Sequence, residues 1–219
     1  MRYEKTYSRI YLIVEFFIVF IFILLPPMLI SENDVVSSPG NFSLSSVLRI
    51  VFFSILLLVL SYDVLLPDSR KSSLKICSEF SLDSFFKHCI SFLILLAMLF
   101  FLNFIFALFS GKTTTENKNQ FSFLATLQIV LAAIFEEILY RKYCTKRLSE
   151  FFTFKFGHLA AILLSAIIFA LAHRYNGWIA VSFSFFSAIL FSILYESTNF
   201  LIYPCFMHII YNLVIFFFL

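Results

Sequence analysis

Long apolar runs recur along the whole chain, and they restrict the folds that its 219 residues can adopt. A helix needs about 20 apolar residues to cross the hydrocarbon core of a bilayer. Hydrophobic residues make up 61% of the chain and charged residues 13%, whereas charged residues make up about 25% of a soluble domain. The sequence therefore excludes an ordinary water-soluble domain and indicates an integral membrane protein.

Seven segments have the length and hydropathy of membrane-spanning helices. They lie at roughly residues 10–30, 47–66, 88–110, 121–145, 157–173, 177–196 and 200–219. We predict an all-α fold, a polytopic transmembrane helix bundle of about seven membrane-spanning helices in one integral membrane domain. Within it, residues 1–120 would supply helices 1 to 3 and residues 121–219 a core of helices 4 to 7.

The distribution of Lys and Arg between the spans predicts how the chain is oriented. Of the 16 basic residues, 12 fall in connections on one side of the predicted bundle. The positive-inside rule then places the N-terminus in the cytoplasm and the C-terminus outside. The net charge of +3 needs no nucleic acid to explain it, and the basic loops would meet the lipid bilayer. The Phe-rich, loop-poor composition leads us to expect a bacterial cytoplasmic membrane protein.

The segment FEEILYR at residues 135–141 places charged side chains inside an apolar run. On a helix, Glu137 and Arg141 are at positions i and i+4, so they can pair. Glu136 points about 100° away around the axis and has no such partner on its own helix. A carboxylate toward the apolar middle costs at least ~2.5 kcal/mol, so such a residue is functional by default. The alternative is a snorkelling cluster at the interface, formed with Arg141, Lys142, Lys146 and Arg147.

Two further segments place polar side chains inside apolar helices. In FALAH, residues 169–173, His173 follows Phe169 by one turn, so the two rings share a face. In HIIYN, residues 208–212, His208 and Asn212 have the same spacing, and both can donate and accept hydrogen bonds. For Glu136 to reach the depth of both histidines, the fourth helix must continue beyond Arg141 to about Leu148.

Other polar residues fit a structural role. Ala161 and Ser165 continue the helix face that carries Phe169 and His173. Several ionisable residues lie near predicted span ends, where we expect interfacial solvation. They are Glu15, Asp63, His88, His158 and Glu196.

Together, EEILYR, FALAH and HIIYN resemble the EExxxR, FxxxH and HxxxN motifs of a known family. These are the CAAX proteases and bacteriocin-processing enzymes, intramembrane endopeptidases that include the eukaryotic type II CAAX prenyl protease. The resemblance covers roughly residues 121–215, and Pro204 matches a proline that often precedes the last motif. Bacterial members commonly have FRG where this chain has Tyr140, Arg141 and Lys142, so we expect different helix packing there and no loss of a reactive group.

The resemblance implies a role for each motif residue. Glu136 would be the general base that activates water, and His173 would help to hold that water or the substrate carbonyl. His208 and Asn212 would stabilise the oxyanion. The pair of Glu137 with Arg141 would fix the helix and bias Glu136, and Phe169 would pack behind the site. The substrate would be a peptide or a membrane-anchored protein.

Cofactor use and catalysis both have alternatives. A divalent metal such as zinc would need three or four ligands, which Glu136, His173 and His208 could begin to supply. The family has been described both as metal-dependent and as using glutamate and histidine directly, and the chain lacks an HExxH motif. The alternative to a protease is a non-proteolytic membrane scaffold or a bacteriocin self-immunity protein on the same fold. An ion or proton transporter is a third class, which no inverted repeat supports.

Overall fold

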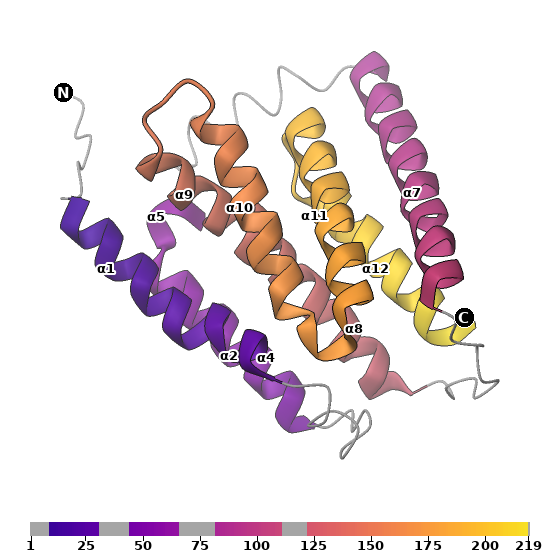
Figure 1. The fold of residues 1–219 in the computed structure, drawn as a ribbon, viewed down its shortest axis with the longest axis horizontal. Helices are drawn as coiled ribbons and strands as arrows, with labels where there is room; N and C mark the ends of the chain where they lie inside the picture. The colour runs from indigo at the N-terminus through magenta and orange to yellow at the C-terminus, as the bar shows by residue number, and fades with distance from the viewer. Residues whose placement is uncertain (1–8, 31–43, 66–81, 111–121, 219) are drawn as a thin grey trace.

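In the part of the chain that the computed structural model describes, short connections join helices, and that part contains no strand (Figure 1). The structure describes residues 9–30, 44–65, 82–110 and 122–218. The predicted all-α class is therefore confirmed.

Within the residues that the structure describes, seven helical units, some built from more than one element, match the seven predicted spans. In chain order the elements are α1 (Arg9–Val19), η1 (Phe20–Leu24), α2 (Leu25–Leu29), α4 (Leu44–Leu60), α5 (Tyr62–Leu65), α7 (Leu82–Ser110), α8 (Phe123–Glu137), η2 (Ile138–Cys144), α9 (Thr145–Phe151), α10 (Gly157–Ala172), η3 (Arg174–Asn176), α11 (Trp178–Thr198) and α12 (Ile202–Phe218). The elements α1, η1 and α2 follow one another without a break, as do α8, η2 and α9.

Several of these helices have the dimensions of membrane spans. Within the described residues, four are long and apolar enough to cross a bilayer: Ile10–Leu29, Leu82–Phe109, Phe123–Phe151 and Trp178–Thr198. Shorter apolar helices occupy Leu44–Leu60, Gly157–Ala172 and Ile202–Phe217. The protein is an integral membrane protein, as predicted, and the orientation of its termini stays a prediction.

Residues with special backbone freedom connect the last helices. A Cβ at Gly157 would collide with the Phe152 backbone, so a side chain there would block the close turn into α10. Gly177 has φ 94° at the start of α11, a conformation that glycine adopts without steric cost. Asn199 ends α11 with φ 58°, a left-handed cap that asparagine tolerates.

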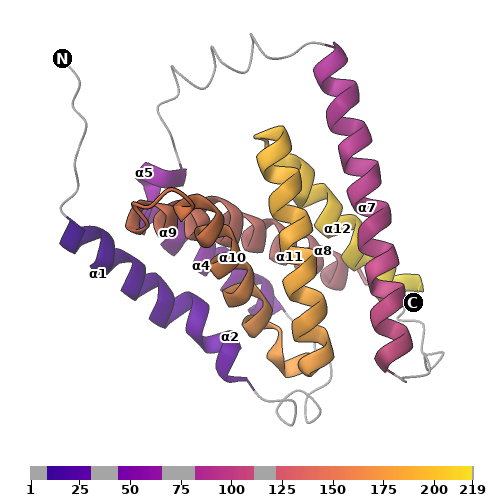
Figure 2. The same cartoon turned by 45° about the horizontal axis from the view of Figure 1, so that its top comes forward.

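The helix formed by α8, η2 and α9 runs across the molecule and contacts both ends of the chain (Figures 1 and 2). α8 packs against α4 on one side and α12 on the other, while η2 and α9 pack on α10. α10 pairs with α11, and α7 covers α11 and α12 at the outer edge.

Two apolar clusters form the interior of the described residues. The first joins α1, η1, α4, η2 and α10 and includes Leu24, Leu57, Tyr143 and Phe169. The second joins α7, α11 and α12 and includes Leu99, Phe191 and Met207. Arg141 and His208 lie where these clusters meet, because each contacts Phe169 of the first and Phe191 of the second.

Candidate active site

The fourth helix continues past Arg141 to Phe151, as the depth argument requires. Its middle section, Ile138–Cys144, is a π-helix, a wider turn that often occurs at functional sites. The Tyr140 carbonyl accepts hydrogen bonds from Thr145 Oγ1 at 2.9 Å and from Ser165 Oγ of α10 at 2.7 Å. The hydroxyl of Ser165 therefore fixes α10 to this helix one turn after Glu136.

Glu137 is fully buried and links two helices. Its Oε2 lies 3.2 Å from Arg141 Nε, which is the i, i+4 ion pair, and the exposed fraction of its side chain is 0%. Its Oε1 accepts a hydrogen bond from His208 Nδ1 of α12 at 2.9 Å. The bond to His208 was not foreseen, because the sequence motifs alone do not show which carboxylate faces α12.

His208 lies between the two adjacent carboxylates. Its Nε2 is 3.7 Å from Glu136 Oε2, while its Nδ1 is bonded to Glu137. The Glu136 side chain is 28% exposed, in contrast to that of Glu137. Its carboxylate can thus meet water and a substrate, whereas the Glu137 carboxylate is confined to holding His208 and Arg141.

Arg141 lies at the junction of the two apolar clusters. Its guanidinium carbon is 5.0 Å from the Phe169 ring centre and 5.5 Å from that of Phe191. Desolvated contacts of this kind are worth about 2 kcal/mol. Among the described residues, its Nη1 and Nη2 atoms have no hydrogen-bond partner. Glu137 is therefore the main charge that balances this buried cation.

Aromatic rings enclose the imidazole of His208. The Phe191 ring stacks on it with centroids 4.8 Å apart, and Phe169 approaches it edge-on at 6.2 Å. These contacts leave the ring little freedom to rotate, so its two nitrogens keep their separate partners.

His173 lies next to Phe169 and does not join Glu136 or His208 directly. Its Nδ1 donates to the Phe169 carbonyl oxygen at 2.9 Å. Since a carbonyl only accepts hydrogen bonds, Nδ1 carries the proton, and Nε2 of the neutral ring is an acceptor. Its ring centre is 4.5 Å from that of Phe169, and no hydrogen bond or ion pair joins it to Glu136 or His208 in the described structure.

Asn212 lies one turn beyond His208 on α12 and is half-buried. No described residue forms a hydrogen bond with its amide. The amide is therefore not committed to a partner within the described protein.

Tyr175 was not singled out in the sequence but lies beside the motif residues. It follows His173 in η3, and the two rings stack with centroids 6.2 Å apart. Burial, and then the negative charge of Glu136, raise the pKa of the Tyr175 phenol. The phenol is thus a neutral hydrogen-bond donor near Glu136, a position that depends on how η3 folds back and that no motif marks.

The residues considered as metal ligands do not form a metal-binding group. In residues 9–30, 44–65, 82–110 and 122–218, no three His, Cys, Asp or Glu side chains are arranged to hold a metal ion. Glu136, His173 and His208, the possible ligands named from the sequence, are thus not gathered into such a group.

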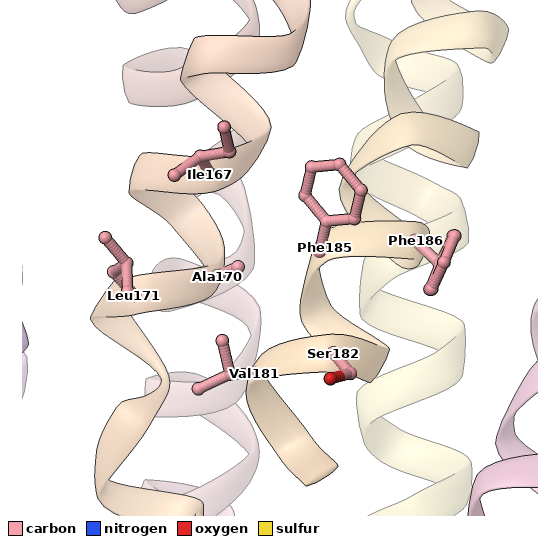
Figure 3. Close-up of a pocket in the computed structure, with 7 residues that line it drawn as sticks. All are labelled: Ile167, Ala170, Leu171, Val181, Ser182, Phe185 and Phe186. Atoms are coloured by element: carbon pink, nitrogen blue, oxygen red, sulfur yellow. The ribbon is translucent and has the colours of Figure 1, made fainter. Parts of the chain in front are cut away.

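An apolar groove of about 240 Å³ lies on the outer surface between α10 and α11 (Figure 3). Its walls are Ile167, Ala170, Leu171, Val181, Ser182, Phe185 and Phe186. None of the predicted site residues lines it, although Leu171 precedes His173 by two positions. The groove is therefore separate from the cluster around His208.

Two sequence interpretations are wrong at the C-terminal end of the fourth helix. Glu15 was expected to be solvated at a span end, and the alternative interpretation of the charged segment placed Arg147 in a snorkelling cluster at the interface. Both are buried, and they form an ion pair of 2.8 Å. Burial between α1 and α9 replaces water by a partner charge, which hydropathy cannot reveal. By contrast, His158 and Glu196 form an exposed pair at 3.1 Å, consistent with the expected interfacial positions.

Comparison with known protein families gives a match over the part of the chain that carries the three motifs. Residues 118–214 match the family described as type II CAAX prenyl endopeptidase Rce1-like. This segment, which is less than half of the chain, is similar to that family. A search of curated proteins and a search of solved structures each found no match. The Rce1-like domain confirms the resemblance to CAAX proteases and includes α8 to η3, α11 and most of α12. The match therefore supports a CAAX-protease-like enzyme, and the long apolar helices support a membrane protein.

Proposed function

We propose that the protein is an intramembrane endopeptidase in which Glu136 activates water and α12 stabilises the oxyanion. The substrate is a peptide or a membrane-associated protein. The observation that carries this proposal is the placement of Glu136 Oε2 3.7 Å from His208 Nε2, with Glu137 bonded to the other ring nitrogen.

Glu136 is the better base of the two carboxylates because its partners leave it accessible. It is partly exposed, and its one described ion-pair partner is His208 at a distance beyond a direct hydrogen bond. In the proposed step, Glu136 takes a proton from water while the water oxygen bonds to the carbonyl carbon of the substrate. The carbonyl electrons move to its oxygen and form the oxyanion.

His208 and Asn212 supply the donors for that oxyanion. Because Nδ1 of His208 donates to Glu137, a donor at Nε2 requires the doubly protonated ring. The two carboxylates, Glu136 and Glu137, then match the two positive charges of His208 and Arg141. Each well-placed donor is worth about 3 kcal/mol of transition-state stabilisation. The tetrahedral intermediate then expels the amine, which takes the proton from Glu136, and leaves a new carboxylate.

His173 fits a supporting role. Its Nε2 is an acceptor since Nδ1 donates to its own helix, so it can accept a hydrogen bond from the attacking water. The Glu137 and Arg141 pair holds His208 and the π-helix in register. No step of this mechanism passes through a metal.

The proposal is tested by comparing the peptides released in membranes that contain the wild-type protein or Glu136→Gln. Glu196→Gln is a matched control, because it makes the same chemical change in an exposed pair that contains no motif residue. We expect fragments that disappear with Glu136→Gln and persist with Glu196→Gln, at equal amounts of membrane protein. An identical set of fragments in all three samples would refute the protease and favour the scaffold. A prenylated peptide ending in a CAAX sequence is the first defined substrate to try, because the matched family is named for it.

A further inference from the structure

A second buried ion pair ties the N-terminal helix to the helix that carries the carboxylates. Arg147 of α9 donates from Nη2 to Glu15 Oε2 of α1 at 2.8 Å and to Oε1 at 3.1 Å, and from Nε to Oε1 at 3.2 Å. Each side chain is 2% exposed. Arg147 also contacts Glu150 at 3.0 Å. A planar guanidinium bound in this way fixes the orientation of α9 relative to α1 as well as the distance between them.

Another basic side chain of the same helix makes a second link to the N-terminal part. Lys142 Nζ of η2 donates to the Leu65 carbonyl oxygen at 2.7 Å. Leu65 ends α5, where a cation also complements the helix C-terminus. Thus two points on one helix are held by two elements, α1 and α5, that precede the Rce1-like domain.

These links lie close enough to the candidate site to control it. Arg147 is ten residues beyond Glu137 on an unbroken helix, about 15 Å along its axis. The intervening π-helix packs against α10, which carries Phe169 and His173. A rotation of α9 would therefore displace Glu136 relative to His208. A misplacement of about 1 Å can lower a rate about 10²-fold.

We infer that α1 and α5 hold the helix that carries Glu136 in place, through the Glu15–Arg147 ion pair and the hydrogen bond from Lys142 to Leu65. We call these two contacts the brace. Glu15 is thus a positioning residue for Glu136, and it acts through Arg147. Glu15 and Leu65 lie outside the segment that matches the family, whereas Arg147 and Lys142 lie inside it. The kinetic consequence of the brace rests on the proposed peptidase activity, but its geometric consequence does not.

Two variants separate positioning from stability. Glu15→Gln leaves Arg147 without its bidentate partner and is expected to destabilise the protein. Glu15→Leu with Arg147→Met removes both charges of the buried pair together, and apolar replacement of a buried pair is often neutral for stability. The double variant also lacks the fixed geometry of the guanidinium, so positioning is lost while stability is kept. Glu196→Gln is the control for a Glu→Gln change in an exposed pair.

The experiment uses the full chain in lipid nanodiscs with two measurements. Spin labels at Lys146→Cys and Phe206→Cys, both exposed in the structure, report the distance between α9 and α12 after the native cysteines are replaced. Cleavage of a prenylated CAAX peptide gives kcat and KM. For the double variant we expect wild-type thermal stability, a broadened distance distribution, and kcat about 10²-fold lower with KM nearly unchanged.

The outcomes decide between the two roles. A double variant with wild-type stability, a narrow distance distribution and wild-type kcat would overturn the brace and leave Glu15 as a stabilising residue. If Glu136→Gln cleaves the peptide as fast as the wild type, the proposed function fails instead. The spin-label distances then judge the brace alone, with a broadened distribution supporting it and an unchanged one refuting it.

Discussion

Glu136 and Glu137 are neighbours of the same residue type, but the structure predicts different effects on thermal stability when each is changed to Gln. In Glu137→Gln the amide oxygen can still accept the hydrogen bond from His208 Nδ1, but the charge beside Arg141 is lost. Arg141 is buried, and in the described structure its Nη atoms have no other partner. Removing one member of a buried pair typically costs about 3–5 kcal/mol.

The cost should appear as reduced thermal stability. For a chain of this size, each kcal/mol corresponds to about 2–4 °C, so Glu137→Gln should unfold about 10 °C below the wild type. Glu136→Gln is the matched control, because that side chain is 28% exposed and pairs at 3.7 Å, and it should unfold within about 2 °C of the wild type. Heating the detergent-solubilised proteins and measuring the remaining monodisperse fraction by size-exclusion chromatography gives both values. Equal unfolding temperatures for the two variants would refute the assignment of Glu137 as the buried counter-charge.

Other residues give separate tests. Asn212→Ala should lower kcat about 10²-fold with little change in KM, measured on the same peptide substrate, and an unchanged kcat would remove Asn212 from the oxyanion site. Ser165→Ala should cost about 1 kcal/mol, because a buried hydrogen bond to Tyr140 is lost, whereas Ser182→Ala, at an exposed hydroxyl bonded within its own helix, should change thermal stability little. Because the pKa of Tyr175 is raised in the folded protein, its contribution to stability is present below the unfolded pKa of about 10 and is lost as pH rises through the folded value. Tyr175→Phe should therefore unfold less readily than the wild type above pH 10, and identical alkaline profiles would contradict this.

Much of the fold followed from hydropathy because spanning helices must be long and apolar. The helix between Phe123 and Phe151 was also predicted to continue past Arg141, since only then could three motifs meet at one depth. Its π-helical section was not predicted. It depends on Tyr140 finding an outside donor in Ser165, and such a tertiary contact has no signature in the spacing of apolar residues.

The residues of the candidate site were marked in the sequence, but their partners were not. Helical spacing shows that Glu136 and Glu137 point in different directions, yet it cannot say which one meets His208. The burial of Glu15 was also hidden, because its partner Arg147 lies 132 residues away. Ionisable residues in apolar helices reveal a need for a partner, and only the packing of helices identifies that partner.

The claim that Glu136 activates water is tested most directly by the rate of peptide cleavage for Glu136→Gln in nanodiscs. General-base catalysis contributes about 10²–10⁴-fold, and the proposed mechanism predicts a loss of kcat in that range while the variant keeps the wild-type unfolding temperature. A Glu136→Gln protein that cleaves at the wild-type rate would contradict it.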